Sequence, residues 1–255
     1  MSVTALLTIE VFDDVDTQAT VTVTAWLGAF EQGITSEDEA QVALLFEAHS
    51  HWRDVLAFTW HITPQAGAKQ IARDVVARQS VVKAQGFEIS ATRTPRRHVK
   101  RVGRECIEAI FCFKTAVGRG EGVLRLVPDP HAGGAAGHKA WLISTSLKEL
   151  KVFEEKIGDN RPSGAAYSRN FGGDNWEDAQ RKAQLYEDHE PTVLVVGGAQ
   201  AGLSVAAQLN QLGVDTLVVE KWLRVGDSWR KRYHSLALHN SIHVNNLPFM
   251  PFPQT

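Results

Sequence analysis

The feature that most constrains the fold is a glycine-rich turn between a run of β-branched residues and a run of small residues. Residues 192–196 (TVLVV) predict a strand, residues 197–202 (GGAQAG) a turn, and residues 202–212 a helix. A second short apolar run, residues 216–220, predicts the next strand. This order is typical of a βαβ unit, in which two parallel strands are joined by a helix. The continuous apolar run TVLVV also predicts a strand that is buried on both faces.

The turn has the spacing of a dinucleotide-binding fingerprint. Gly197 permits the tight turn, Gly202 lets the helix pack close to the sheet, and the helix N-terminus offers free amides to a pyrophosphate. Ala199 replaces the usual middle glycine, so its methyl group either is accommodated by a small shift or weakens binding. Glu220 follows 220 − 197 = 23 residues after the first glycine, where a carboxylate binds ribose hydroxyls and disfavours a 2′-phosphate. The candidate cofactor-binding residues are Gly197, Gly198, Ala199, Gln200, Ala201, Gly202 and Glu220.

The residues after the second strand resemble the flavin-containing monooxygenases. Residues 226–229 (GDSW) resemble the G-G-x-W turn of that family, and residues 247–253 (LPFMPFP) resemble a later segment. The resemblance implies FAD as the cofactor and makes Asn240 a candidate catalytic residue, as an amide that faces the flavin. Trp229 fits a core aromatic as well as a place beside the flavin. The further cofactor contacts that the resemblance implies are Lys221, Gly226, Trp229 and His239.

The same resemblance implies a reaction. In it, FAD is reduced by NADPH, forms a flavin hydroperoxide with O₂ and oxygenates a small organic substrate. From Val193 onward the chain has 255 − 193 + 1 = 63 residues, fewer than the ~100–150 of a typical domain, and no second glycine fingerprint for NADPH. We therefore expect an incomplete Rossmann unit and the N-terminal portion of a monooxygenase that is inactive alone. The alternative is a non-catalytic ligand-binding or dimerisation protein with a vestigial dinucleotide-binding unit.

The first part of the chain places helices before strands, which is typical of an α+β domain. Residues 19–33 carry an apolar stripe at helical spacing, residues 35–39 predict the cap of a second helix that runs through Phe46, and residues 68–79 predict a third. The expected strands cover residues 107–117, 122–127 and 139–147, and residues 118–121 are the expected turn between the first two.

Residues 1–153 also resemble the SnoaL-like, nuclear-transport-factor-2-like domains, through Trp52-Arg53-Asp54, Thr59-Trp60 and residues 139–142. This resemblance implies an α+β cone, with a possible homodimer through this domain. Residues 154–190 form a connector, and residues 191–255 start the FAD-binding domain. Asp54 and His61 are candidate bases. The aromatic residues that either line a pocket or fill the core are Trp26, Trp52, Phe58, Trp60 and Trp141.

Charge and composition argue against several other functions. A net charge of −2 provides no general attraction to nucleic acid. Residues 93–104 hold six Arg or Lys without interleaved aromatics, so we expect a solvated strand-turn face there. The histidines form no recognisable metal-ligand set, and Cys106 and Cys112 lie too far apart on a strand to bridge. With no signal peptide and no apolar run of about 20 residues, we expect a cytoplasmic protein without a membrane partner.

Overall fold

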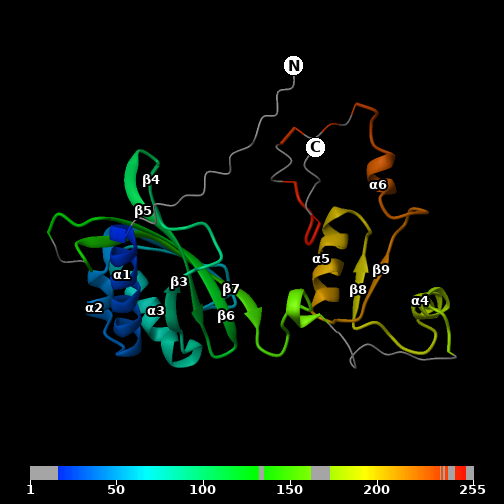
Figure 1. Cartoon of the computed structure of the whole chain (residues 1–255), viewed down its shortest axis with the longest axis horizontal. Coiled ribbons are helices and arrows are strands. Elements are labelled where there is room, and N and C mark those ends of the chain that lie inside the picture. The colour runs from blue at the N-terminus through cyan, green and yellow to red at the C-terminus, as the bar shows by residue number, and fades with distance from the viewer. Residues whose placement is uncertain are drawn as a thin grey trace, which may run out of the picture. The chain divides into compact units, whose positions relative to one another are not determined.

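The computed structural model describes residues 17–131, 135–161, 173–235, 237, 239–240 and 245–250. The chain divides into two compact units, Met1–Lys151 and Val152–Thr255, called unit 1 and unit 2 below (Figure 1). Unit 1 is an α+β domain and unit 2 contains a βαβ unit, so the expected fold class is confirmed. No helix among these residues has the length and apolar character needed to cross a membrane.

Three helices cover one face of the sheet in unit 1 (Figure 1). The expected apolar stripe forms the buried face of the first helix, and the indole Nε1 of Trp26 donates a hydrogen bond to the carbonyl oxygen of Leu45 at 3.0 Å. The carboxylate of Asp38 caps the second helix by accepting from the backbone N–H of Gln41 at 2.9 Å. The helices are α1 (Thr17–Thr35), α2 (Glu39–Leu44) and α3 (Ala68–Val82).

Unit 1 contains one seven-stranded sheet in the order β2-β1-β7-β6-β5-β3, with β4 also paired to β5. Strands β1 and β7 are parallel and all the other neighbours are antiparallel. The strands are β1 (Phe46–Val55), β2 (Pro64–Ala66), β3 (Gln85–Ile89), β4 (Arg97–Arg101), β5 (Arg104–Lys114), β6 (Gly118–Pro128) and β7 (His138–Leu150).

Two expectations about the strands of unit 1 are wrong. The expected helix through Phe46 ends at Leu44, because Phe46 opens β1 and packs edge-on against Trp26, with ring centroids 5.6 Å apart. The turn between β5 and β6 lies at residues 115–117 rather than at 118–121. The two glycines of the expected turn are instead part of β6. A Cβ on Gly120 would meet the ring of Phe113 in β5, and a Cβ on Gly118 would meet the carbonyl oxygen of Glu149 in β7.

Aromatic rings link the helices of unit 1 to its sheet. Phe87 of β3 stacks on Phe113 of β5 with ring centroids 4.9 Å apart, and Phe30 of α1 meets Phe87 edge-on at 5.4 Å. Such pairs add to the stabilisation that burial of the rings provides. Unit 1 is therefore organised around one continuous hydrophobic core.

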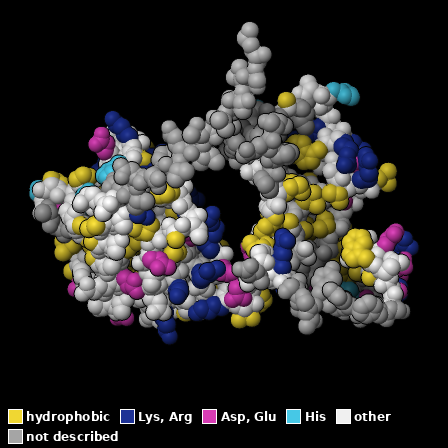
Figure 2. Space-filling model, in the orientation of Figure 1, with side chains coloured by type: hydrophobic (Ala, Val, Ile, Leu, Met, Phe, Trp, Pro, Cys, Tyr) yellow, Lys and Arg dark blue, Asp and Glu magenta, His cyan; other side chains and the backbone are white. Residues whose placement is uncertain are grey.

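Unit 2 is built around two parallel strands joined by a helix. Its elements are η1 (Gly158–Asn160), α4 (Trp176–Leu185), β8 (Val193–Val196), α5 (Gln200–Gln211), β9 (Thr216–Val219) and α6 (Asp227–Arg230). The expectation that the first strand is buried on both faces is wrong. Val195 lies on the side of α5, whereas Leu194 and Val196 are 55% and 81% exposed. Figure 2 shows hydrophobic side chains at the surface of this unit.

Candidate cofactor site

The glycine turn of unit 2 has the backbone geometry that its sequence requires. Gly197 adopts a φ of +111°, a conformation that residues with a Cβ rarely adopt. A Cβ on Gly202 would lie 1.9 Å from the carbonyl oxygen of Gly197, so only glycine lets α5 begin this close to the end of β8. These two glycines place the N-terminus of α5 next to the carboxyl end of the strand pair.

The first turn of α5 carries backbone N–H groups that have no partner within the helix. Ala199 occupies the N-cap position in an extended conformation and its side chain accepts no hydrogen bond. The positive end of the helix dipole lies at the same place. The amides of Gln200 and Ala201 at this end are therefore suited to hold an anionic group.

Glu220 lies directly beside the glycine turn. Its Oε2 accepts a hydrogen bond from the backbone N–H of Gly198 at 2.7 Å, and its Oε1 accepts one from the N–H of Trp222 at 3.2 Å. The hydrogen bond from Trp222, followed by those from Gly198 and Lys221, lowers the pKa of Glu220 below its ordinary value. The side chain is thus an ionised acceptor at neutral pH.

A pocket of about 550 Å³ opens between these elements. It brings together four of the candidate residues, namely Gly197, Ala199, Glu220 and Lys221. The other four lining residues were not among the candidates of the sequence analysis: Val196, Val219, Trp222 and Ser228. The ammonium group of Lys221 lies 5.1 Å from the centre of the Trp222 ring, and the position of this tryptophan directly after Glu220-Lys221 is the signal that would have found it.

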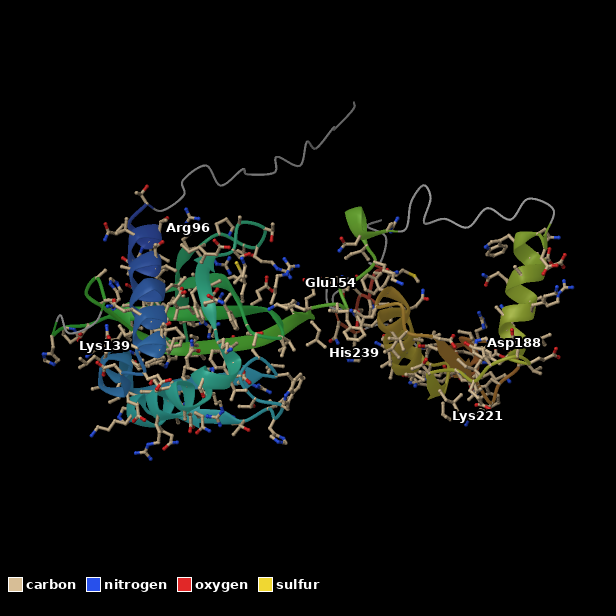
Figure 3. The ribbon with its side chains drawn as sticks, turned by 90° about the horizontal axis from the view of Figure 1, so that it is seen from below. Arg96, Lys139, Glu154, Asp188, Lys221 and His239 are labelled. Atoms are coloured by element: carbon tan, nitrogen blue, oxygen red, sulfur yellow. The ribbon has the colours of Figure 1, made fainter. Side chains whose placement is uncertain are left out.

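The candidates that come later in the chain are not among the residues that line this described pocket. Gly226 has a φ of +86° and precedes α6, and Trp229 is 40% exposed, with the guanidinium carbon of Arg232 4.8 Å from its ring centre. His239 is exposed, and Figure 3 shows it apart from Lys221. Asn240 is also exposed, and its carbonyl oxygen accepts a hydrogen bond from Asn245.

Asp227 holds the turn after β9 in place. Its carboxylate is buried and accepts hydrogen bonds from the guanidinium groups of Arg224 and Arg230 at 3.2 and 3.0 Å. Burial by itself would raise the pKa of Asp227, but the hydrogen bonds from these two arginines and the charges of Arg224 and Lys231 lower it. The GDSW turn is therefore anchored by its acidic residue.

The two candidate bases of unit 1 lie in different surroundings. Asp54 is buried, and its carboxylate accepts from the backbone N–H groups of Phe58 and Thr59 and, at 2.6 Å, from the hydroxyl of Thr145. These bonds fix the loop after β1. His61 is exposed, whereas Asp54 is buried.

The aromatic residues of unit 1 divide between core and surface. Trp26, Trp52 and Phe58 are buried in the core, whereas Trp60 is 65% exposed. Trp141 is partly buried, with the guanidinium carbon of Arg104 4.9 Å from its ring centre. The described residues thus place three of the five in the core.

Comparison with known proteins finds similarities over the same part of the chain. Residues 190–231 match the family described as "FAD binding domain". A probable indole-3-pyruvate monooxygenase, YUCCA4 of Arabidopsis thaliana, is 40% identical over 75 residues, which are 29% of this chain and 18% of that protein. An uncharacterised CzcO-like oxidoreductase of Geobacillus kaustophilus is 42% identical over 62 residues, 24% of this chain and 18% of that protein. The matched region thus spans about a fifth of these relatives.

Solved structures are similar to about half of the chain. A nuclear transport factor 2-like superfamily protein from Salmonella enterica covers 51% of this chain and 90% of its own, with 13% identity and a TM-score of 0.36. A domain with a cystatin-like fold from Nostoc punctiforme covers 52% and 78%, with 11% identity and a TM-score of 0.39. Because both scores are low, the α+β description of unit 1 rests on its own strand order and core.

Proposed function

We propose that this chain carries an FAD-binding unit and belongs to an FAD-dependent monooxygenase. The resemblance inferred from the sequence motifs is confirmed by the family match and by the monooxygenase relatives. The observation that carries the proposal is the Glu220 carboxylate, which lies 2.7 Å from the amide of Gly198 in the pocket at the end of β8 and β9.

Glu220 in this pocket and the neighbouring first turn of α5 fit the adenosine diphosphate half of FAD. Glu220 is ionised and would accept hydrogen bonds from the ribose hydroxyls, while its charge would repel a 2′-phosphate. The amides of Gln200 and Ala201 would bind the diphosphate at the positive end of α5. Bound FAD would supply the redox and oxygen chemistry, and these residues hold and orient it.

The remaining parts of the proposal concern the whole protein. We propose NADPH as the reductant, a small organic molecule as the substrate and the cytoplasm as the location. The residues described here provide one dinucleotide-binding turn, and we propose that it binds FAD. Unit 1 is proposed to serve as an accessory domain that can form a homodimer.

The test is the affinity of the purified chain for FAD. Quenching of flavin fluorescence on titration measures the dissociation constant, and FMN, which lacks the adenosine half, is the matched ligand control. We expect FAD to bind and FMN to bind much more weakly. Glu220→Gln should weaken FAD binding at least about tenfold, because the neutral amide accepts fewer hydrogen bonds from the ribose. Glu187→Gln, at an exposed carboxylate of unit 2, should leave the affinity unchanged.

A folded chain that binds no FAD would overturn the proposal. So would equal affinity for FAD and FMN, or equal FAD affinity in the wild-type chain and Glu220→Gln. A folded, colourless dimer would instead favour a non-catalytic binding or dimerisation protein built on unit 1.

A further inference from the structure

A row of charged side chains crosses the face of the unit 1 sheet that is opposite to its helices. The strand register pairs Arg97 of β4 with Glu108 of β5 and pairs Glu108 with Arg125 of β6. The two oxygens of Glu108 accept from Arg97 at 3.1 Å, from Arg101 at 3.1 and 2.8 Å, and from Arg125 at 2.9 Å. One carboxylate therefore faces three guanidinium groups.

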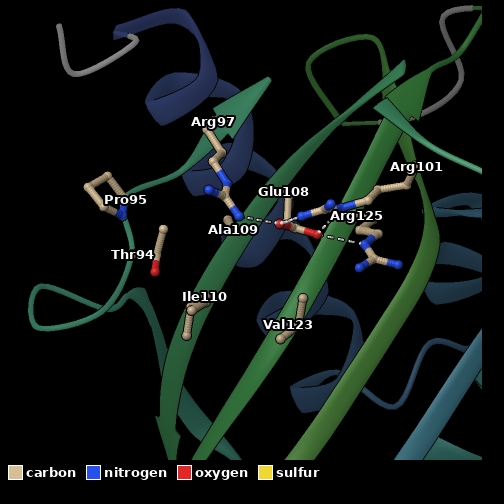
Figure 4. Close-up of a pocket in the computed structure, with 9 residues that line it drawn as sticks. All are labelled: Thr94, Pro95, Arg97, Arg101, Glu108, Ala109, Ile110, Val123 and Arg125. Carbon is tan, nitrogen blue, oxygen red and sulfur yellow. Dashed lines mark hydrogen bonds and ion pairs between the residues drawn. The ribbon is translucent and has the colours of Figure 1, made fainter. Parts of the chain in front are cut away.

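This cluster forms one wall of a pocket of about 220 Å³ (Figure 4). Ile110 and Val123 lie side by side on β5 and β6 below the cluster, and Thr94 and Pro95 border the pocket from the loop before β4. The pocket thus combines an apolar part with a charged part. Small-molecule sites have this character, because apolar surface provides affinity and a few polar groups fix orientation.

The charges in the pocket do not cancel. Three guanidinium groups and one carboxylate give a formal charge of 3 − 1 = +2, and the hydrogen bond from Arg101, despite opposing burial, lowers the pKa of Glu108 to about 2, so the carboxylate remains ionised. Each guanidinium has five N–H donors, and the four bonds to Glu108 use only part of them. Figure 4 shows the two terminal nitrogens of Arg125 directed away from Glu108. The pocket therefore retains charge and donors for an anion.

We propose that this pocket binds a small organic anion, a carboxylate or phosphate ester whose charged end contacts the arginines and whose apolar body lies over Ile110 and Val123. Guanidinium groups suit both head groups, because their planar N–H pairs match carboxylate and phosphate oxygens. The site lies in unit 1 and is independent of the proposed FAD site in unit 2.

The test is calorimetric titration of the full chain with benzoate and with phenyl phosphate, which identifies the head group. Benzyl alcohol is the neutral control, and inorganic phosphate is the control without an apolar body. We expect saturable binding of at least one organic anion, no saturable binding of benzyl alcohol, and weaker binding of inorganic phosphate. Arg97→Gln should weaken binding of the organic anion about tenfold or more, because one charge-assisted contact is lost.

Two further variants make the test specific. Arg93→Gln removes a similarly exposed arginine that pairs with Glu121 outside the pocket lining, and it should leave binding unchanged. Glu108→Gln removes the competing carboxylate, so the folded variant should bind the anion several-fold more tightly. The proposal is overturned if neither organic anion binds, if Arg93→Gln weakens binding as much as Arg97→Gln, or if folded Glu108→Gln binds less tightly than the wild-type chain. If Glu108→Gln does not fold, the comparison of Arg97→Gln with Arg93→Gln decides.

Discussion

Glu108 shows how a single residue can depend on the pairing of its own strand with both neighbouring strands. Its side chain is 11% exposed and accepts hydrogen bonds from two arginines of β4 and one of β6. Removal of the carboxylate would leave these like charges facing one another. The residue therefore contributes to stability while it is ionised.

The stability contribution of Glu108 should depend on pH. Its pKa is about 2 in the folded chain against an ordinary value of 4.5, so the contribution is fully present above about pH 4.5 and is lost as the pH falls through about 2. With allowance for solvent screening, we expect Glu108→Gln to lower the free energy of unfolding by about 1–3 kcal/mol at pH 7. Urea denaturation of both chains, followed by tryptophan fluorescence, should show the difference shrinking between pH 4.5 and 2.5. A difference that stays constant over this range would contradict the assignment.

Sequence reasoning reached Glu220 but not Glu108, and the reason is physical. The position of Glu220 is fixed by a short local unit of strand, turn, helix and strand, so residue spacing alone indicates it. The partners of Glu108 meet it only through the register of three strands. That register depends on how the whole sheet packs, and no local pattern contains it.

Strand β6 is the element whose sequence is most easily misinterpreted. It begins with three alternating glycines, at positions 118, 120 and 122, which resemble a turn but belong to a paired strand. A Cβ on Gly120 would lie 2.2 Å from the ring of Phe113, and a Cβ on Gly122 would lie 2.3 Å from the ring of Phe111. The missing side chains thus make room for the two phenylalanines of β5.

A pair of glycine substitutions tests this account. Gly122→Ala should destabilise unit 1 by about 1–3 kcal/mol, because the added methyl group would meet both the Phe111 ring and the carbonyl oxygen of Ser144. Gly28→Ala is the matched control, since it lies in α1 with no atom within 4 Å of the added Cβ, and it should stabilise by about 0.5–1 kcal/mol. Thermal unfolding followed by circular dichroism measures both. Equal shifts in the two variants would show that packing against Phe111 is not the cause.

The helices of unit 1 were predicted from periodic patterns rather than from composition. The stripe in α1 and the cap of α2 were predicted because helical spacing and capping act within a few residues. Strand β1 was not recognised at Phe46, because an apolar residue after a helix fits either a last turn or a first strand residue. The choice is made by the contact between Phe46 and Trp26, which lies outside the local sequence.

The two units differ in how completely they are buried. Unit 1 has a continuous core between helices and sheet, whereas none of the residues of α5 is buried and two residues of β8 are largely exposed. Backbone hydrogen bonds in poorly buried elements open with less free energy than those in a core. Unit 2 should therefore be the less stable part of the chain.

Hydrogen exchange of the whole chain measures this difference. We expect the amides of β6 and β7 to exchange at least about tenfold more slowly than those of β8 and β9, because the former pair with neighbours on both sides in a packed sheet. FAD at about 100 times its dissociation constant should slow exchange in β8 and β9, because it raises the free energy of opening there by up to about 2.7 kcal/mol. Exchange in β6 and β7 should remain unchanged. Equal protection of the two sheets without FAD would contradict the difference in burial.

The parallel pairing of β1 with β7 has a consequence for how unit 1 is made. Trp52 of β1 lies opposite Ile143 of β7, and its indole N–H donates to Thr145 of the same strand. During synthesis the ribosome adds α3 and the strands β2 to β6 before this partner exists, so β1 emerges long before its interior neighbour. Assembly must close a long loop late, which is typical of slow-folding topologies. Until β7 is translated, the nascent chain presents one side of β1 unpaired.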